Sequence, residues 1–333
     1  MRKLNISIGS DEIPRLGYGC MGLTQAYAPV EITKAKKLLQ HIVGDGPVML
    51  DTAATYSGGR NESLVGSVIK TKREHVFLAS KAGLYKNPDG SSVIDGDPER
   101  IIQSCEESLS RLRTEVIDLF YLHRVDPLIP IEESVGAIGT LVDQGKVRYA
   151  GLSEVSQSSV IRASSVTRID AVQSEYSIWS RRVEDGISRY CKDHEIALIA
   201  YSPVGRGFLA GGVKRTEALT SQDIRRTMPR FQEHQFDENI NTLDQLELLA
   251  IDWDMTLAQL SLNWIWSQGA HIAAIPGTSS LAHWKDNQKA QSILDTEQLD
   301  AIEAILLEFP FVGDRYTPDK LLQLDSERNT LGH

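Results

Sequence analysis

Short apolar segments alternate with longer amphipathic ones along most of the chain. The short segments read as buried strands, and eight of them are predicted, at 16–20, 48–51, 76–80, 117–122, 147–152, 170–173, 197–201 and 271–275. The longer segments carry apolar residues three and four positions apart, as helices with one buried face do. The clearest are 98–112, with Asp97 as N-cap and Pro98 at the first helical position, and 131–143.

Strict alternation of strands and helices predicts an α/β fold with parallel strands and crossover helices. Eight such units fit a closed (β/α)8 TIM barrel, whereas six or seven in an open sheet would fit a doubly wound fold. A length of 333 residues is enough for two domains, but no inter-domain linker is evident. We therefore expect a single barrel domain over 1–333.

Three segments lie outside the repeating units. Residues 3–14 read as an amino-terminal β-hairpin with its turn at 9–11, placed to plug the bottom of the barrel. A polar, non-periodic stretch at about 205–241 predicts a long loop at the face where barrel enzymes keep their sites. The tail at 309–333 is a second candidate flap.

Composition narrows the class of protein. The chain is 41% hydrophobic, which is ordinary for a globular protein, and its formal net charge of −10 disfavours nucleic acid and anionic lipid as partners. No segment is long and apolar enough to span a membrane, and the first twelve residues lack the apolar stretch of a secretory signal. We expect a cytoplasmic protein, with Cys20, Cys105 and Cys191 as reduced thiols and no metal site.

Four polar side chains follow predicted strands at the end where barrel chemistry is found. These are Asp51, Tyr56, Lys81 and His123. Each alone has an ordinary structural explanation, such as a helix cap for Asp51 or a satisfied core histidine for His123. Together they indicate more, because a lysine and an aspartate near a barrel axis are tolerated only when they are paired.

The motifs around these residues resemble those of the aldo-keto reductases. The segments DTAATYSGGRNESLVG, FLASKAG, DLFYLHRVDP, GKVRYAGLSE, VQSEYS, AYSPVGRGFLAG and IPGTSS match in order and spacing over about residues 10 to 310. GLSEVSQSS and VQSEYSIWSRRVED are most similar to the branch that contains pyridoxal reductases and related broad-scope microbial aldehyde reductases. The resemblance implies a TIM barrel that reduces a small carbonyl substrate to an alcohol with NAD(P)H.

The family's catalytic tetrad then falls on Asp51, Tyr56, Lys81 and His123. The resemblance implies that Tyr56 protonates the carbonyl oxygen as hydride arrives. Lys81 would lower the pKa of Tyr56 by favouring the phenolate, and Asp51 would hold Lys81 in place. His123 would donate a hydrogen bond that orients the substrate carbonyl.

The resemblance also assigns residues to the cofactor. Ser153 and Gln173 would hold the carboxamide, and Tyr201 would stack on the nicotinamide ring. The pyrophosphate would meet Ser202, Pro203, Val204, Gly205, Arg206, Gly207 and Leu209. The ribose phosphate and adenine would meet Gly277, Thr278, Ser279, His283 and Asn287.

Two departures from the family pattern bear on the cofactor. Many members place Lys or Arg at positions matching Gly277, Ser279, Ser280 or His283, where they bind the 2′-phosphate of NADP, and this chain has none. Losing one or two charged hydrogen bonds would reduce NADP preference by a factor of about ten to several hundred. NADP stays the first choice, with NAD as the alternative. Glu154 replaces an asparagine and can only accept hydrogen bonds, so it would take the amino group of the carboxamide.

Substrate contacts are expected from loops that are more apolar than charged, at Met21, Tyr85, Arg124 and Trp179. This favours an aldehyde with an aromatic or apolar part, pyridoxal included, over a large sugar phosphate. Whether the chain forms homo-oligomers is left open.

Two other classes compete with this interpretation. The family includes nicotinamide-binding regulatory subunits of potassium channels, but those carry an extra amino-terminal segment, whereas this barrel is predicted to begin almost at Met1. Gly17, Gly19 and Gly22 spell the G-x-G-x-x-G of a dinucleotide-binding dehydrogenase, yet no helix pattern starts until about residue 30. Tyr316 and Lys320 imitate the Tyr-x-x-x-Lys pair of short-chain dehydrogenases, but Pro318 between them would break the helix that such a pair needs.

Overall fold

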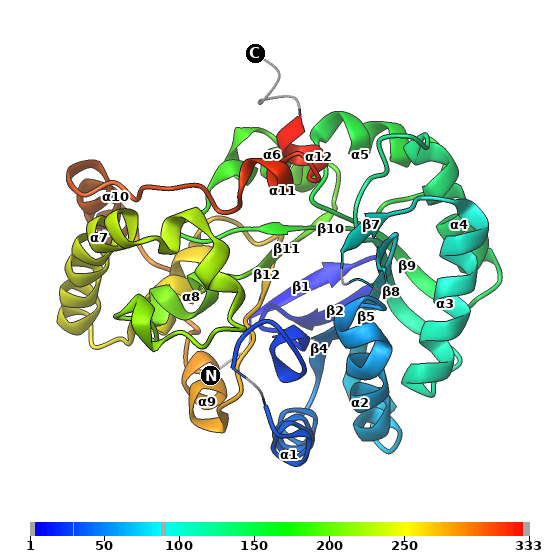
Figure 1. Cartoon of the computed structure of the whole chain (residues 1–333), viewed down its shortest axis with the longest axis horizontal. Helices are drawn as coiled ribbons and strands as arrows, with labels where there is room; N and C mark the ends of the chain where they lie inside the picture. Colours follow the sequence, from blue (N-terminus) through cyan, green and yellow to red (C-terminus); the bar gives the residue numbers. More distant parts are fainter. Residues whose placement is uncertain (1–3, 29, 88, 90, 329–333) are drawn as a thin grey trace.

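A computed structural model describes residues 4–28, 30–87, 89 and 91–328, and its centre is one eight-stranded sheet. Every neighbouring pair of strands in this sheet is parallel. The sheet curls round until its first and last strands meet, where Leu16 bridges Ala274 and the Gly17 amide donates to the Ala274 carbonyl at 2.8 Å. The predicted (β/α)8 TIM barrel is therefore confirmed (Figure 1).

All eight predicted strands are present, three of them with the predicted bounds and the others with shifted ends. The barrel strands are β3 (Tyr18–Gly19), β4 (Val48–Asp51), β5 (Val76–Ala82), β8 (Ile117–Leu122), β9 (Val147–Ser153), β10 (Ala171–Glu175), β11 (Ala197–Tyr201) and β12 (Ile272–Ile275). Strand β5 extends two residues beyond its predicted end, and β9 extends one. Consequently Lys81 and Ser153 lie inside strands whose ladder hydrogen bonds fix their backbone.

Helices surround the sheet and bury their apolar faces against it (Figure 1). Two predicted helices, α3 (Pro98–Leu112) and α4 (Ile131–Asp143), have the expected bounds, and the Asp97 side chain accepts from the Arg100 amide as an N-cap does. The others are α1 (Ile32–Gly44), α2 (Arg60–Ile69), α5 (Gln157–Ser164), α6 (Ile187–Asp193), α7 (Glu233–Asp252), α8 (Leu257–Ser267), α9 (Leu281–Asn287), α10 (Thr296–Glu308), α11 (Pro318–Leu321) and α12 (Asp325–Arg328).

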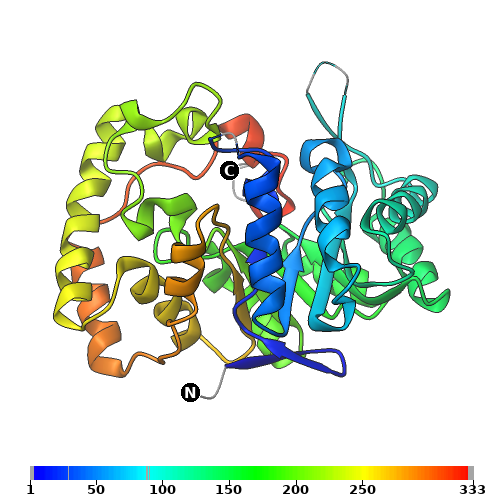
Figure 2. The same ribbon diagram turned by 90° about the horizontal axis from the view of Figure 1, so that it is seen from below.

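The amino-terminal hairpin closes one end of the barrel, as predicted. Strands β1 (Asn5–Ile8) and β2 (Asp11–Pro14) pair antiparallel around a turn at Gly9 and Ser10. Ile6, Ile8 and Ile13 are buried in one cluster with side chains that fill the barrel interior. In Figure 2 this dark blue hairpin and the red carboxyl-terminal helices lie at opposite ends of the molecule. The opposite end is therefore the one left free for a site.

The segment after β11 is not the single long loop that the sequence predicts. It contains short 3₁₀ turns, η5 (Gly205–Ala210), η6 (Thr216–Ala218), η7 (Ile224–Thr227) and η8 (Pro229–Phe231), and α7 already begins at Glu233. The predicted end near 241 is wrong because the first turns of α7 offer a weak apolar pattern. Phe236 is buried there, but Asn239 is a polar core residue that holds Arg230 and Val312 by hydrogen bonds.

The tail returns across the free end of the barrel as an irregular segment followed by two short helices. We call residues 309–328 the strap; it carries α11 and α12 and is red in Figure 1. Predicted residues 329–333 lie outside the described part of the chain. Cys20, Cys105 and Cys191 are buried and unbonded, as expected. Among the described residues, no helix has the length and apolarity needed to cross a bilayer.

Candidate active site

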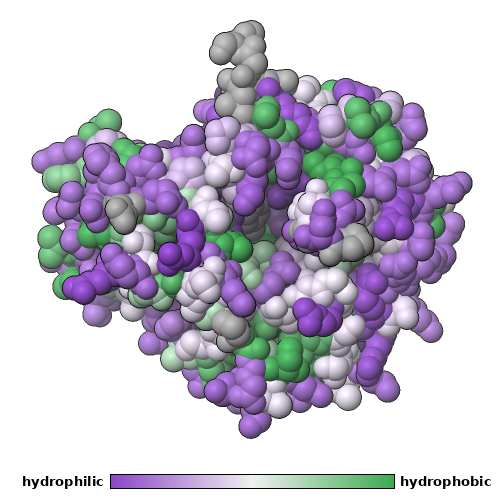
Figure 3. Space-filling model, viewed as in Figure 1, coloured by the Kyte–Doolittle hydropathy of each residue, from purple (hydrophilic) through white to green (hydrophobic). Residues whose placement is uncertain are grey.

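The four predicted catalytic residues meet at the carboxyl ends of three adjacent strands. Asp51 is the last residue of β4, Lys81 lies near the end of β5, and His123 follows β8. These strands are neighbours in the order β4, β5, β8. Tyr56 opens η2 (Tyr56–Gly59), directly after β4. This end of the barrel faces the viewer in Figure 3, which shows it hollowed near its centre.

Lys81 is a buried cation with a fixed set of partners. Its Nζ forms an ion pair with Asp51 and donates to the Thr52 carbonyl at 2.8 Å. The second oxygen of Asp51 accepts from Gln173 Nε2 at 2.8 Å. Because the Lys81 side chain is 1% exposed, pairing is what makes its charge tolerable there.

Tyr56 and His123 pack against each other beside this ion pair. The rings of Tyr56 and His123 meet edge to face with centroids 6.0 Å apart, and Lys81 Nζ lies 5.3 Å from the Tyr56 ring centroid. Lys81 and the Tyr56 phenol are also close enough for each to shift the pKa of the other. A phenol, an ammonium, a carboxylate and an imidazole thus occupy one spot, as the sequence predicts.

Burial and neighbouring charges together set the protonation states in this cluster. Burial raises the pKa of Tyr56, and although Lys81 lowers that pKa, the net shift is upward. The expected influence of Lys81 is present, but the expected net lowering is wrong because the phenol is more desolvated than the sequence could indicate. For Lys81, burial lowers the pKa, but Asp51 and Tyr56 outweigh it, so the net shift is upward and the ammonium persists.

His123 is neutral at this site. Burial lowers the pKa of His123 well below its ordinary value, and the charges of Arg124 and Lys81 lower it further. Its Nδ1 is buried and has no hydrogen-bond partner among the described residues. A neutral imidazole can donate one hydrogen bond without repelling Lys81.

The residues predicted to hold a cofactor follow the next strands round the barrel. Ser153, Gln173 and Tyr201 lie on β9, β10 and β11, which are adjacent. The predicted pyrophosphate residues directly follow β11, and Gly277, Thr278 and Ser279 directly follow β12. His283 and Asn287 lie on α9. The structure therefore places every one of them at the same end as the tetrad.

Two of these residues are engaged by the strap. Arg206 Nη2 donates to the Tyr316 hydroxyl at 2.6 Å and to Glu175 at 3.3 Å, and the Tyr201 hydroxyl lies 3.3 Å from that of Tyr316. Arg206 adopts a left-handed conformation with φ of 57°, which turns the loop back toward the barrel. Tyr316 precedes α11, so it shares no helix face with Lys320 and the short-chain dehydrogenase pair is excluded.

Glu154 is paired in a way that the sequence did not reveal. It accepts both arms of Arg315 in the strap, at 3.0 and 2.7 Å, and also the Glu175 amide at 2.9 Å. Burial raises the pKa of Glu154, but Arg315, the charge of Arg124 and the Glu175 amide together outweigh burial and lower that pKa to about 2. Both carboxylate oxygens are thus occupied, contrary to the expected role toward a carboxamide. Arg315 was missed because 161 residues separate it from Glu154 and no local pattern connects them.

The four expected substrate residues lie in different surroundings. Arg124 adjoins His123, donating to its carbonyl at 2.6 Å, and Met21 begins η1 (Met21–Leu23) directly after β3. Tyr85 lies on the small antiparallel sheet of β6 (Leu84–Lys86) and β7 (Ser92–Ile94), where it packs on Arg100. Trp179 is 6% exposed and packs in an aromatic cluster with Phe208, Phe231 and Phe311.

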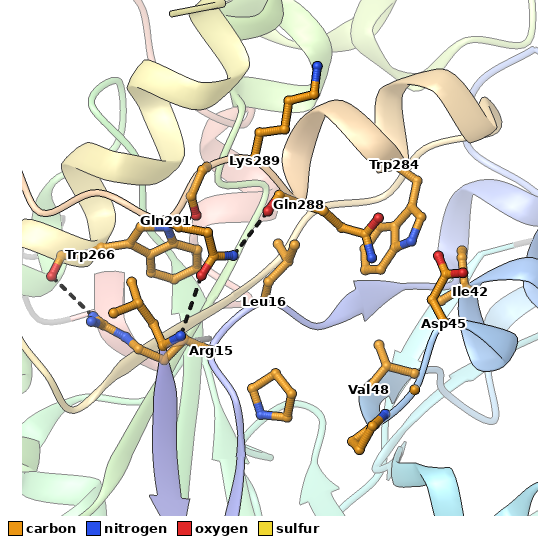
Figure 4. Close-up of a pocket in the computed structure, with 15 residues that line it drawn as sticks. Arg15, Leu16, Ile42, Asp45, Val48, Trp266, Trp284, Gln288, Lys289 and Gln291 are labelled. Carbon is orange, nitrogen blue, oxygen red and sulfur yellow. Dashed lines mark hydrogen bonds between the residues drawn. The ribbon is translucent and has the colours of Figure 1, made fainter. Parts of the chain in front are cut away.

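A separate cavity of about 430 Å³ lies beside the hairpin, lined by Trp266, Trp284 and Arg15 among others (Figure 4). Arg15 is 4% exposed and gives its donors to the carbonyls of Ile272, Trp266 and Gly269. Its guanidinium therefore binds backbone carbonyls before and within β12 and is not available to a ligand.

Among the described residues, no group of three His, Cys, Asp or Glu side chains is arranged to hold a metal ion.

Known proteins resemble this chain over nearly its whole length. The Aldo/keto reductase family profile matches residues 15–307. Aldo-keto reductase yakc [NADP(+)] of Schizosaccharomyces pombe is 36% identical over 93% of this chain and 94% of its own length. Probable aldo-keto reductase 1 of Glycine max is 39% identical over 86% of this chain and 83% of its own. The solved structure of a glycerol dehydrogenase from Gluconobacter oxydans superposes with a TM-score of 0.85 at 25% identity, covering 95% of this chain and 99% of that one. The chain belongs to the aldo/keto reductase family.

Proposed function

We propose that this protein reduces an aldehyde or ketone to the corresponding alcohol, with NADPH as the reductant. The observation that carries the proposal is the Asp51–Lys81 ion pair set against the Tyr56 phenol, with neutral His123 beside it. This arrangement combines a proton donor, a fixed positive charge and a hydrogen-bond donor at one point. Those are the groups that a carbonyl needs when its oxygen gains negative charge.

Reduction requires a hydride and a proton, which come from different sources. A reduced nicotinamide, when bound, supplies the hydride that forms the new C–H bond at the carbonyl carbon, and it leaves oxidised. Tyr56 gives its proton to the oxygen as the C=O π bond breaks. Lys81 stabilises the phenolate that remains, Asp51 fixes Lys81, and His123 orients the carbonyl by donating a hydrogen bond.

The residues present fit a nicotinamide cofactor. Tyr201 offers an aromatic ring at the same end of the barrel as the tetrad, and Ser153 and Gln173 offer polar groups on the two preceding strands. Gly205 and Gly207 have φ of 56° and 89°, and a Cβ at Gly205 would lie 3.0 Å from both Leu209 and Trp179. Glycines there keep the backbone amides approachable for a pyrophosphate.

The choice between NADP and NAD depends on the residues that would meet the 2′-phosphate. NADP is favoured because the Schizosaccharomyces pombe relative is named for NADP(+). NAD is the alternative, because no Lys or Arg stands at Gly277, Ser279, Ser280 or His283 to bind a 2′-phosphate. For the substrate we propose an aldehyde with an aromatic or apolar part, with pyridoxal as one candidate.

The test is steady-state oxidation of NADPH and NADH with a panel of aldehydes that includes pyridoxal. We expect many turnovers per enzyme, alcohol formed in equal amount to the oxidised cofactor, and higher kcat/KM with NADPH. Tight cofactor binding without turnover on any aldehyde would instead identify a nicotinamide-binding regulatory protein and contradict the proposal.

A further inference from the structure

Arg124 presents a guanidinium beside the tetrad that is only partly used by the protein. Its Nη1 donates to the His123 carbonyl at 2.6 Å and lies 3.4 Å from Ser153 Oγ. Its Nε and Nη2 make no hydrogen bond to the part of the chain that the structure describes, and neither is buried without a partner. The side chain is half-buried. One side of the guanidinium is therefore free at the mouth of the barrel.

The other buried cations at this end all have carboxylate partners. Lys81 pairs with Asp51, while Arg206, Arg230 and Arg315 surround Glu175, and Arg315 also takes both oxygens of Glu154. Within the described residues, Arg124 has no carboxylate within 4.0 Å. Glu154 is near enough for the Arg124 charge to lower its pKa, but it is paired with Arg315 and does not contact Arg124. A partly buried cation with no carboxylate in contact is costly to keep, and a bound anion would offset that cost.

Arg124 is near enough to act on the reacting groups. Its charge lowers the pKa of His123 and opposes the upward shift in the pKa of Tyr56. An anion bound by Arg124 would thus be close enough to a carbonyl at Tyr56 and His123 for both groups to belong to one small substrate. A guanidinium offers parallel N–H groups that match the two oxygens of a carboxylate.

We propose that Arg124 determines substrate specificity by binding a carboxylate carried by the substrate, so that the preferred substrates are carbonyl compounds bearing a carboxylate. This inference rests on the proposed function and refines it, because the sequence favoured an apolar aldehyde. The reaction is unchanged: the hydride goes to the carbonyl carbon and the Tyr56 proton to its oxygen, while the carboxylate keeps its charge.

A matched pair of substrates isolates the charge. The first is 4-carboxybenzaldehyde and the second is its methyl ester, which keeps the ring and the aldehyde but is neutral. For the wild type we expect kcat/KM to be about 10- to 100-fold higher for the acid, with the difference mainly in KM. Arg124→Gln should bring the ratio of the two substrates to about one, and Arg124→Lys should recover part of it because it restores a point charge.

Two controls complete the design. Arg60→Gln removes an exposed cation at the start of α2, near the same end of the barrel, and should leave the acid-to-ester ratio as in the wild type. The affinity for NADPH is measured by fluorescence for each variant, because a cation can also bind a cofactor phosphate. An acid-to-ester ratio near one in the wild type, or weaker NADPH binding in Arg124→Gln with the ratio unchanged, would overturn the inference. Turnover of the ester alone would still support the proposed function. Turnover of neither compound would overturn the inference, and it would contradict the proposed function only if no aldehyde of the panel were turned over.

Discussion

Tyr56 holds its proton more tightly than a tyrosine in water, since burial raises its pKa by more than Lys81 lowers it. A proton donor must be protonated to act, so a raised pKa extends activity toward high pH. We expect kcat for reduction to stay level as pH rises from neutral, and to fall only above the ordinary tyrosine pKa of about 10. A pH profile of kcat checks this. A fall centred below about pH 9 would show that the phenol is more acidic than its surroundings imply.

The four tetrad residues are the part of the site that sequence predicted best. Their motifs are local, and each lies at or just beyond the end of an apolar strand, so a correct strand places them at one end of a barrel. Arg315 and Tyr316 have no such signal, because their partners Glu154 and Arg206 are more than a hundred residues away. The net shift in the pKa of Tyr56 could likewise not be predicted from sequence, since it depends on how far the folded protein desolvates the phenol.

At the scale of elements, the strap is joined to the barrel by the ion pair of Glu154 and Arg315. The pKa of Glu154 is lowered to about 2, so its carboxylate stabilises the fold above its ordinary pKa of 4.5, and that contribution is lost as pH falls toward 2. Glu154→Gln should lower the free energy of unfolding at pH 7 by about 3 kcal/mol, because it leaves Arg315 with fewer partners. It should also flatten the loss of stability between about pH 4.5 and 2.

Urea unfolding at several pH values measures both effects. Glu132→Gln is the matched control, because Glu132 forms a similar two-armed pair with Arg162 on the surface, where solvent screens it. We expect little change from that control. Equal unfolding midpoints for Glu154→Gln and the wild type at pH 7 would show that the strap is held by other contacts.

The closure of β3 on β12 explains the glycines that imitate a dinucleotide-binding motif. A Cβ at Gly19 would lie 2.8 Å from the Ile275 carbonyl, and one at Gly17 would lie 2.9 Å from the Ile275 side chain. The next helix, α1, starts only at Ile32, so no helix begins at these glycines. Their role is close strand packing, and the dehydrogenase interpretation is excluded.

Gly19→Ala should therefore destabilise the protein by about 1 to 3 kcal/mol, because backbone atoms must shift to admit the methyl group. Gly136→Ala is the matched control. Gly136 lies inside α4, where an added Cβ meets nothing within 4 Å, so alanine should stabilise the protein by roughly 0.5 to 1 kcal/mol. Thermal unfolding of both variants measures the difference. A Gly19→Ala variant as stable as the wild type would contradict this account of the barrel seam.

Periodicity predicted the elements of the barrel because most of its strands are short, apolar and buried on both sides. It failed where a polar residue is buried. In the first turns of α7, Asn239 is a core residue and its hydrogen bonds replace apolar contacts. The ends of β5 and β9 lie beyond their predicted positions for the same reason. Lys81 and Ser153 are polar, so they read as the residues after a strand although the ladder includes them.

For the whole molecule, the barrel brings together groups that the chain keeps far apart. Residues 51, 56, 81 and 123 converge at one end, the cofactor residues continue along the next four strands, and the strap crosses the same end. The hairpin plugs the other end, where its three isoleucines pack against the strand side chains that fill the interior, and this leaves one open mouth. In the proposed reaction, chemistry at that mouth depends on one proton donor, Tyr56.

The most direct test of this account is the Tyr56→Phe variant, measured for turnover and for NADPH binding on the same preparation. Phenylalanine keeps the ring beside His123 and Lys81 but has no proton to give. We expect kcat with an aldehyde that the wild type reduces to fall by about 10² to 10⁴, while the NADPH dissociation constant changes by less than about threefold. Turnover close to that of the wild type, with the cofactor still bound, would contradict the assignment of Tyr56 as the proton donor.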